Sequence, residues 1–176
     1  MMIRSSKILF SLLMISLVFL FFGCSHVVYP RGPIPVKTDV VGSMDAKKEV
    51  SFINGVADSK LTLIATQGSH KYFADYRQWT GLVVSQLESE LKSRGVQVQS
   101  EGGTVFKVAV ESVGLFWGSF SQRCIVRLRV EKGDGSWSKT YEGNNASGNL
   151  PRALDGAVYK IVVAILSDQD FKNALR

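Results

Sequence analysis

Two segments of the chain carry apolar side chains at the spacing of a helix. Between Phe73 and Arg94 an apolar residue recurs every four positions, and these residues are Trp79, Val83, Leu87 and Leu91. This stripe predicts an amphipathic helix with one buried face. The face expected in solvent carries Glu88, Glu90, Lys92 and Arg94. A second helix is predicted from Pro151 onward, with a stripe of Leu154, Val158, Ile161 and Ile165.

Elsewhere the apolar positions alternate with polar ones, which predicts strands. The first strands are expected near Val50–Asn54 and Leu61–Ala65, and a short one at Val96 and Val98. The clearest alternation comes later, in Phe106, Val108 and Val110 and then in Cys124, Val126, Leu128 and Val130. Gly133-Asp134-Gly135 predicts a hairpin that returns through Trp137–Glu142. One buried and one wet face is typical of antiparallel sheets.

These elements predict an α+β fold of two layers. A mostly antiparallel sheet of four to six strands would carry the two amphipathic helices on one face. We expect a single domain over residues 49–176. Residues 24–48 contain Pro30, Pro33 and Pro35 and are predicted to be an extended linker that holds the domain away from its anchor. Within this linker, Val36–Val41 has the alternative of pairing as an edge strand.

The start of the chain has the pattern of a secretory signal peptide over residues 1–23. Arg4 and Lys7 precede the apolar run Ile8–Phe22, and the small Gly23 stands before Cys24. The run is short for a membrane span, which needs roughly 20 apolar residues. An uncleaved helical anchor and ordinary secretion with Cys24 retained remain the alternatives.

Phe22-Gly23-Cys24 resembles the lipobox of bacterial lipoproteins. In that family the cysteine thiol is alkylated with diacylglycerol, the signal is cut before the cysteine, and the new amine is acylated. Several acyl chains hold a protein stably on a membrane. Ser25 after the cysteine resembles outer-membrane sorting in enteric bacteria, which implies a place on the periplasmic side of the outer membrane of a Gram-negative cell.

The order of elements resembles small envelope lipoproteins of the YajG type, and more loosely the lipoprotein subunit of the lipopolysaccharide translocon. Besides the lipobox, the segments that carry this likeness are Trp79–Gly95, Lys107–Val110, Cys124–Gly135 and Leu154–Val158. The resemblance implies a non-enzymatic scaffold or accessory role.

Composition and charge change this picture little. The formal net charge of +6 includes Arg4 and Lys7, so a chain without its signal would be less basic. A mild basic excess suits both solubility and proximity to anionic lipid. If Cys24 is acylated, Cys124 has no partner for a disulfide, and its place in an apolar alternation predicts a small buried core residue.

The chain offers little for catalysis. Neither His26 nor His70 lies at metal-ligand spacing from another His or Cys, and no catalytic, cofactor or metal motif is found. Nucleic acid is not an expected partner, because export would separate the chain from it and no ribonucleoprotein pattern is present. A hydrolase that uses His70 with nearby acids stays an alternative.

Two features are candidates for binding. Arg123, Arg127 and Arg129 alternate along one strand, and with Lys107 they would form an anion-binding surface on the wet face of the sheet. The alternative is a solvated face in which Glu111 and Glu131 pair with these cations. The second feature is the turn Gly114–Phe120, whose aromatic residues Phe116, Trp117 and Phe120 would form either an exposed contact tip or a lid on the core.

We therefore expect a membrane-anchored, non-enzymatic envelope lipoprotein that binds another envelope component, either a protein or an anionic glycolipid. A lipid- or lipopolysaccharide-binding accessory of an export machine is the first alternative, and a peptidoglycan- or lipid-modifying hydrolase is the second. The sequence leaves the oligomeric state open.

Overall fold

The computed structural model describes residues 23–42, 44 and 49–176. The predicted signal peptide therefore lies outside the described residues, apart from Gly23. No helix within the described part of the chain has the length and hydropathy that crossing a membrane requires.

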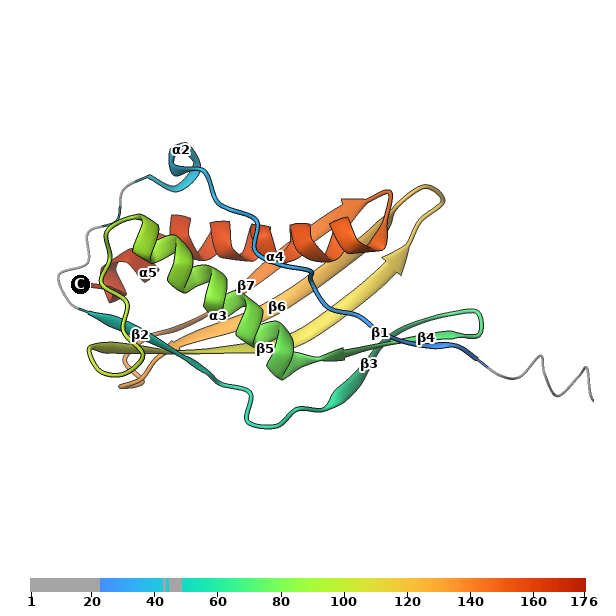
Figure 1. Cartoon of the computed structure of the whole chain (residues 1–176), viewed down its shortest axis with the longest axis horizontal. Coiled ribbons are helices and arrows are strands. Elements are labelled where there is room, and N and C mark those ends of the chain that lie inside the picture. Colours follow the sequence, from blue (N-terminus) through green and yellow to red (C-terminus); the bar gives the residue numbers. More distant parts are fainter. Residues whose placement is uncertain (1–22, 43, 45–48) are drawn as a thin grey trace, which may run out of the picture.

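The fold is α+β with two layers, as predicted (Figure 1). The main sheet has the strand order β2 (Val50–Asn54), β5 (Thr104–Trp117), β6 (Gln122–Lys132) and β7 (Ser138–Ser147). Helices α3 (Tyr76–Ser93) and α4 (Leu150–Ser167) lie together on one face of this sheet, and the short helix α5 (Gln169–Ala174) follows α4. A smaller sheet has the order β1 (Ser25–Val27), β4 (His70–Asp75) and β3 (Leu61–Gln67).

Both sheets are mixed, whereas the sequence predicted one mostly antiparallel sheet. β2 pairs with β5 in parallel, and β1 pairs with β4 in parallel. Strands joined by a tight turn pair antiparallel, as β5, β6 and β7 do. β2 and β5 are separated by two strands and a helix, and a crossover of this kind returns the chain in the same direction. The parallel pairs were missed because the sequence pattern shows strands but not their partners.

The boundaries of α3 differ from the prediction for a local reason. β4 continues to Asp75, and the Asp75 carboxylate then caps the helix by accepting hydrogen bonds from the backbone N–H groups of Arg77 and Gln78. The hydrogen bond from Ser59 is the largest cause that lowers the pKa of Asp75, and it keeps the cap ionised. The helix therefore begins at Tyr76 rather than Phe73.

The core fills the space between the main sheet and the helices. Its largest buried side chains include Trp79 and Leu87 from α3, Phe106 and Leu128 from the sheet, and Phe171 from α5. Cys124 is fully buried, as predicted, and burial raises the pKa of its thiol to about 12. That thiol is therefore protonated and unreactive in the folded protein.

Helix α4 lies very close to strand β7. A Cβ atom at Gly143 would stand 2.1 Å from the backbone oxygen of Ala157, so only glycine permits this approach. Asn149 caps the start of α4 by accepting a hydrogen bond from the Arg152 N–H at 3.0 Å, and Pro151 lies in the first turn as predicted.

The segment predicted as a linker packs on the domain. Residues 28–42, here called the N-terminal strap, cross the outer side of the helices, and Val28, Val36 and Val41 are buried in the core (Figure 1). The strap ends in a one-turn helix, α2 (Thr38–Val41), and not in an edge strand. For residues 24–42 the linker prediction is therefore corrected, because apolar side chains and backbone groups of this segment find partners on α3 and α4.

Candidate functional site

The four predicted basic residues lie on the face of the main sheet that the helices leave open. On β6 the exposed Arg123, Arg127 and Arg129 alternate with buried residues that point toward the helices. Lys107 is exposed on β5 and is paired with Glu131 in the strand register. The structure thus brings the four cations onto one surface.

Two of these arginines have acidic neighbours. Arg127 Nε lies 3.0 Å from Glu142 Oε2 on β7, and a nitrogen of Arg129 lies 3.4 Å from Glu131 Oε2. These pairs are exposed, so water screens them and each contributes little to stability. No carboxylate of the described residues lies within ion-pair distance of Arg123. The face therefore keeps an unneutralised guanidinium near its β5–β6 end.

A β-bulge in β5 decides which aromatic side chain joins this face. The register shifts between Val110 and Ser112, so odd-numbered residues face outward before the bulge and even-numbered ones after it. Phe116 consequently lies opposite Arg123 on the open face, and Trp117 turns to the other side. Sequence alternation alone does not reveal the extra residue.

The predicted aromatic turn divides into two parts. β5 continues to Trp117, so the turn itself is only Gly118–Ser121. Trp117 is partly buried against Tyr72, with 4.8 Å between the ring centres. Phe116 is 54% exposed and Phe120 is 96% exposed. Trp117 therefore packs as a lid, whereas Phe120 stands free at the tip.

A shallow pocket joins the basic and aromatic features. It has a volume of about 300 Å³ and is lined by Phe116, Gly118, Ser121, Arg123 and Ile125, with Trp117 beside them. Apolar side chains and one guanidinium in the same depression match a ligand that carries an anionic group next to an apolar part.

The two histidines meet at the same end of the molecule. His26 Nε2 lies 2.9 Å from His70 Nδ1, so the partner of His70 is a second imidazole from β1. No group of three or more His, Cys, Asp or Glu side chains suited to a metal ion occurs within the described ranges. Cys24 is exposed, and its carbonyl oxygen accepts a hydrogen bond from the Lys71 N–H at 2.8 Å.

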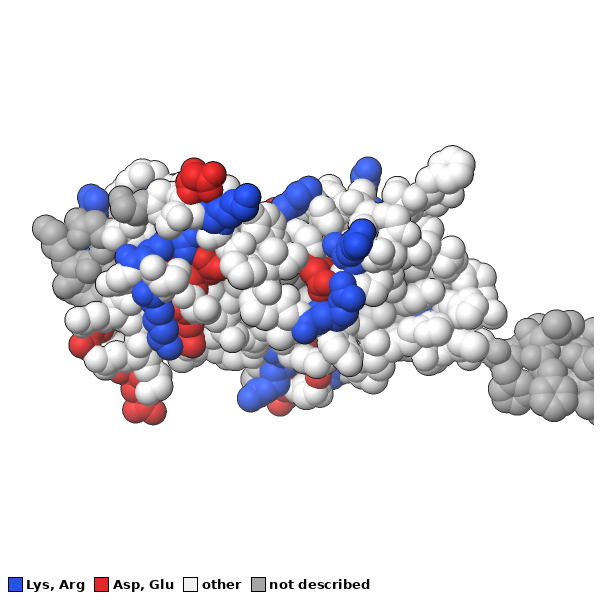
Figure 2. Space-filling model, turned by 45° about the horizontal axis from the view of Figure 1, so that its top comes forward, with Lys and Arg blue, Asp and Glu red and all other residues white. Residues whose placement is uncertain are grey.

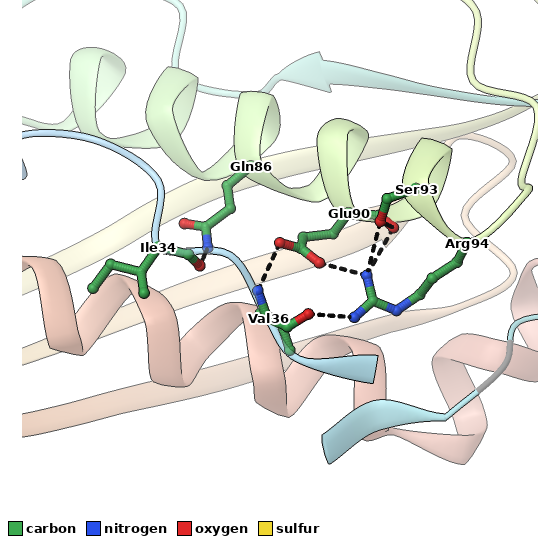
Figure 3. Close-up of polar contacts among 6 residues, drawn as sticks. All are labelled: Ile34, Val36, Gln86, Glu90, Ser93 and Arg94. Carbon is green, nitrogen blue, oxygen red and sulfur yellow. Dashed lines mark hydrogen bonds and ion pairs between the residues drawn. The ribbon is translucent and has the colours of Figure 1, made fainter. Parts of the chain in front are cut away.

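A buried polar cluster of Gln86, Glu90 and Arg94 holds the strap (Figure 3). Glu90 Oε1 accepts a hydrogen bond from the Val36 N–H at 2.8 Å, and Gln86 Nε2 donates to the Ile34 carbonyl at 2.7 Å. Arg94 donates to the Val36 carbonyl at 2.9 Å and pairs with the Glu90 carboxylate. The expectation that Glu90 and Arg94 face solvent is wrong, because their side chains are covered by the strap. The signal in the sequence is weak: Gln86 and Glu90 border the apolar stripe at a spacing of four.

Comparison with known proteins gives no family. No family model matches the chain, and no curated protein matches it. One solved structure, described as an uncharacterised protein, aligns with 86% of this chain and 94% of its own length, at 12% sequence identity and a TM-score of 0.32.

Proposed function

We propose that this protein is a membrane-anchored, non-enzymatic lipoprotein of the cell envelope that binds an anionic envelope component through the open face of its main sheet. The anchor would be acyl chains on Cys24, on the periplasmic side of an outer membrane. Two observations support the anchor: Cys24 is exposed, and strand β1 begins at Ser25, directly after it.

The arrangement of the main sheet carries the proposal for binding. One face is covered by α3 and α4, while the other presents Lys107, Arg123, Arg127 and Arg129 with the pocket at Arg123. Guanidinium groups match phosphate and carboxylate geometry, and the neighbouring Phe116 and Ile125 add apolar contact. An acidic protein surface and an anionic glycolipid such as lipopolysaccharide both present this chemistry.

Cys24→Ser tests the anchor. We expect the wild-type chain in the membrane fraction with incorporated palmitate, and the variant unlabelled and released from the membrane. Cys124→Ala is the matched control, because the buried thiol is not a candidate for lipidation. Unchanged processing and fractionation of Cys24→Ser would contradict the anchor.

Photocrosslinking in intact cells tests the binding face. A photoreactive residue at Thr140, exposed on the open face, is compared with one at Lys92, exposed on α3. We expect a crosslinked adduct from position 140, and Arg123→Glu should reduce its yield. Arg152→Glu makes the same charge change at an exposed position on α4 and should leave the yield unchanged. An adduct that a protease degrades identifies a protein partner, and a ladder of adduct bands on a gel identifies lipopolysaccharide. Recovery of the monomer alone from both positions would refute the proposal.

The hydrolase alternative stays a prediction. Loss of cell-wall or lipid degradation in His70→Ala would favour it over a binding role.

A further inference from the structure

No flexible linker separates Cys24 from the domain, because hydrogen bonds to β4 begin at Cys24 itself. The Cys24 carbonyl is bonded to the Lys71 N–H, and β1 then pairs with β4 from Ser25 to Val27. The next backbone group, the Val28 N–H, donates to the Phe73 carbonyl at 2.9 Å. A group attached to Cys24 is therefore held at one fixed place on the domain.

The N-terminal strap fixes this place from the other side. The side chain of Trp79 is fully buried in the core, and its Nε1 donates a hydrogen bond of 3.0 Å to the Val28 carbonyl. The Arg31 backbone N–H, Nε and terminal nitrogen bond the Asp155 carboxylate of α4 at 2.8, 3.1 and 2.9 Å. The domain therefore cannot rotate freely about Cys24, and the end that carries Cys24 must face the surface to which this residue is attached.

The tip of the β5–β6 hairpin lies at this same end. Aromatic contacts connect the two regions: His26 stacks on Tyr72 with 5.0 Å between the ring centres, and Tyr72 packs at a tilt against Trp117 with 4.8 Å between the ring centres. Trp117 leads directly into the turn that exposes Phe120. Along the long axis, the start of β1, the β3–β4 turn and the β5–β6 turn all lie at one end, and the β6–β7 turn lies at the other (Figure 1).

One face of this end is also poor in charge. Figure 2 shows few Lys, Arg, Asp or Glu side chains there, whereas charges of both signs are scattered over the rest of the face in view. A turn in water is normally polar, and an almost fully exposed phenylalanine at its tip has an apolar surface without a partner. Aromatic residues of this kind settle at the boundary between lipid head groups and acyl chains.

We infer that this end of the domain rests on the lipid bilayer and that Phe120 inserts into it as a second contact beside the acylated Cys24. The inference rests on the proposed lipidation, because the acyl chains bring this end to the membrane. It fixes the orientation: the long axis rises from the bilayer, and the β6–β7 turn lies far from it. The open basic face then stands at the side of the domain, accessible to a component of the envelope.

A fluorescent label tests the insertion. Phe120→Cys in the full lipoprotein is labelled with the environment-sensitive dye NBD, and Ser136→Cys in the exposed β6–β7 turn is the matched control. Cys124 is buried with a pKa of about 12 and Cys24 would be acylated, so the dye attaches to the new thiol. Both proteins are placed in vesicles of phosphatidylethanolamine and phosphatidylglycerol, some of which contain nitroxide-labelled lipid.

We expect a blue-shifted emission at position 120 that nitroxide lipid quenches, and at position 136 a water-like emission that aqueous iodide quenches. If the proteins float with the vesicles but both labels respond alike to iodide, the inference fails and the proposed anchor stands. If the proteins do not float with the vesicles, the anchor fails and the inference fails with it. Protection of position 120 only in native envelope vesicles would replace the bilayer by a protein partner and would also overturn the inference.

Discussion

Replacing Glu90 by alanine is predicted to loosen the strap and destabilise the whole domain. The Glu90 side chain is 8% exposed, and that of its partner Arg94 is 2% exposed. One carboxylate oxygen accepts the Val36 N–H, and the other pairs with Arg94. Arg94 Nε is buried and has no hydrogen-bond partner among the described residues. Among these residues Glu90 supplies the one carboxylate within ion-pair distance of the Arg94 guanidinium, so it compensates the charge.

The size of the effect follows from this burial. Removing one partner of a buried ion pair costs about 3–5 kcal/mol, because the remaining charge stays uncompensated. A buried N–H without an acceptor costs about 1–3 kcal/mol, although the two costs overlap here because one carboxylate serves both groups. We expect Glu90→Ala to lower the free energy of unfolding by about 3–5 kcal/mol. Adding Arg94→Met should recover part of the loss, because no charge is then left buried.

Two assays check this prediction. Urea unfolding followed by tryptophan fluorescence gives the free energy, with the exposed Lys92→Ala as the control on the same helix. Trypsin cleavage after Arg31 and Lys37 reports opening of the strap, since cleavage follows the population of the open form. A loss of 3 kcal/mol from the closed strap corresponds to roughly a 100-fold increase in that population. An unfolding free energy within about 1 kcal/mol of wild type, together with unchanged cleavage, would refute the reasoning.

Two further predictions concern packing and pH. Gly143→Ala should lower the free energy of unfolding in urea by about 1–3 kcal/mol, because its Cβ would overlap the Ala157 backbone oxygen. Gly148→Ala is the control and should be neutral, because Gly148 has open space around it. Equal effects of the two substitutions would contradict the close approach of α4 to β7. Burial raises the pKa of Asp168, but hydrogen bonds from Tyr141 and Lys139 outweigh burial and hold this pKa below its ordinary value of 3.8. Asp168 therefore stabilises the fold above that value and loses this effect as the pH falls through the folded pKa. In Asp168→Asn, the free energy of unfolding should consequently fall less steeply as the pH is lowered into the acid range. A pH dependence equal to that of the wild type would contradict this prediction.

Local patterns predicted much of the fold. The stripe from Trp79 to Leu91 gave α3, and the alternation around Leu128 gave β6, because each pattern reflects one buried face of a single element. The same period of two placed Arg127 and Arg129 together on the open face, as the structure has them.

The features that local patterns missed depend on contacts between distant parts of the chain. Val36 and Glu90 are 54 positions apart, and only the folded α3 and α4 create the surface that binds the strap. A composition with three prolines is equally compatible with a free linker and with a docked extended segment. The β-bulge after Val110 could not be predicted from the sequence for another reason. The extra residue reverses which faces of the sheet Phe116 and Trp117 lie on, but the two residues still alternate between the faces.

The central claim is that Cys24 carries the acyl chains that place this domain at the envelope. Mass spectrometry of the intact mature protein purified from membranes tests it most directly. The account predicts a chain that begins at Cys24, with diacylglycerol on the thiol and an acyl group on the amine. A chain that retains Met1, or one with an unmodified Cys24 thiol, would contradict it.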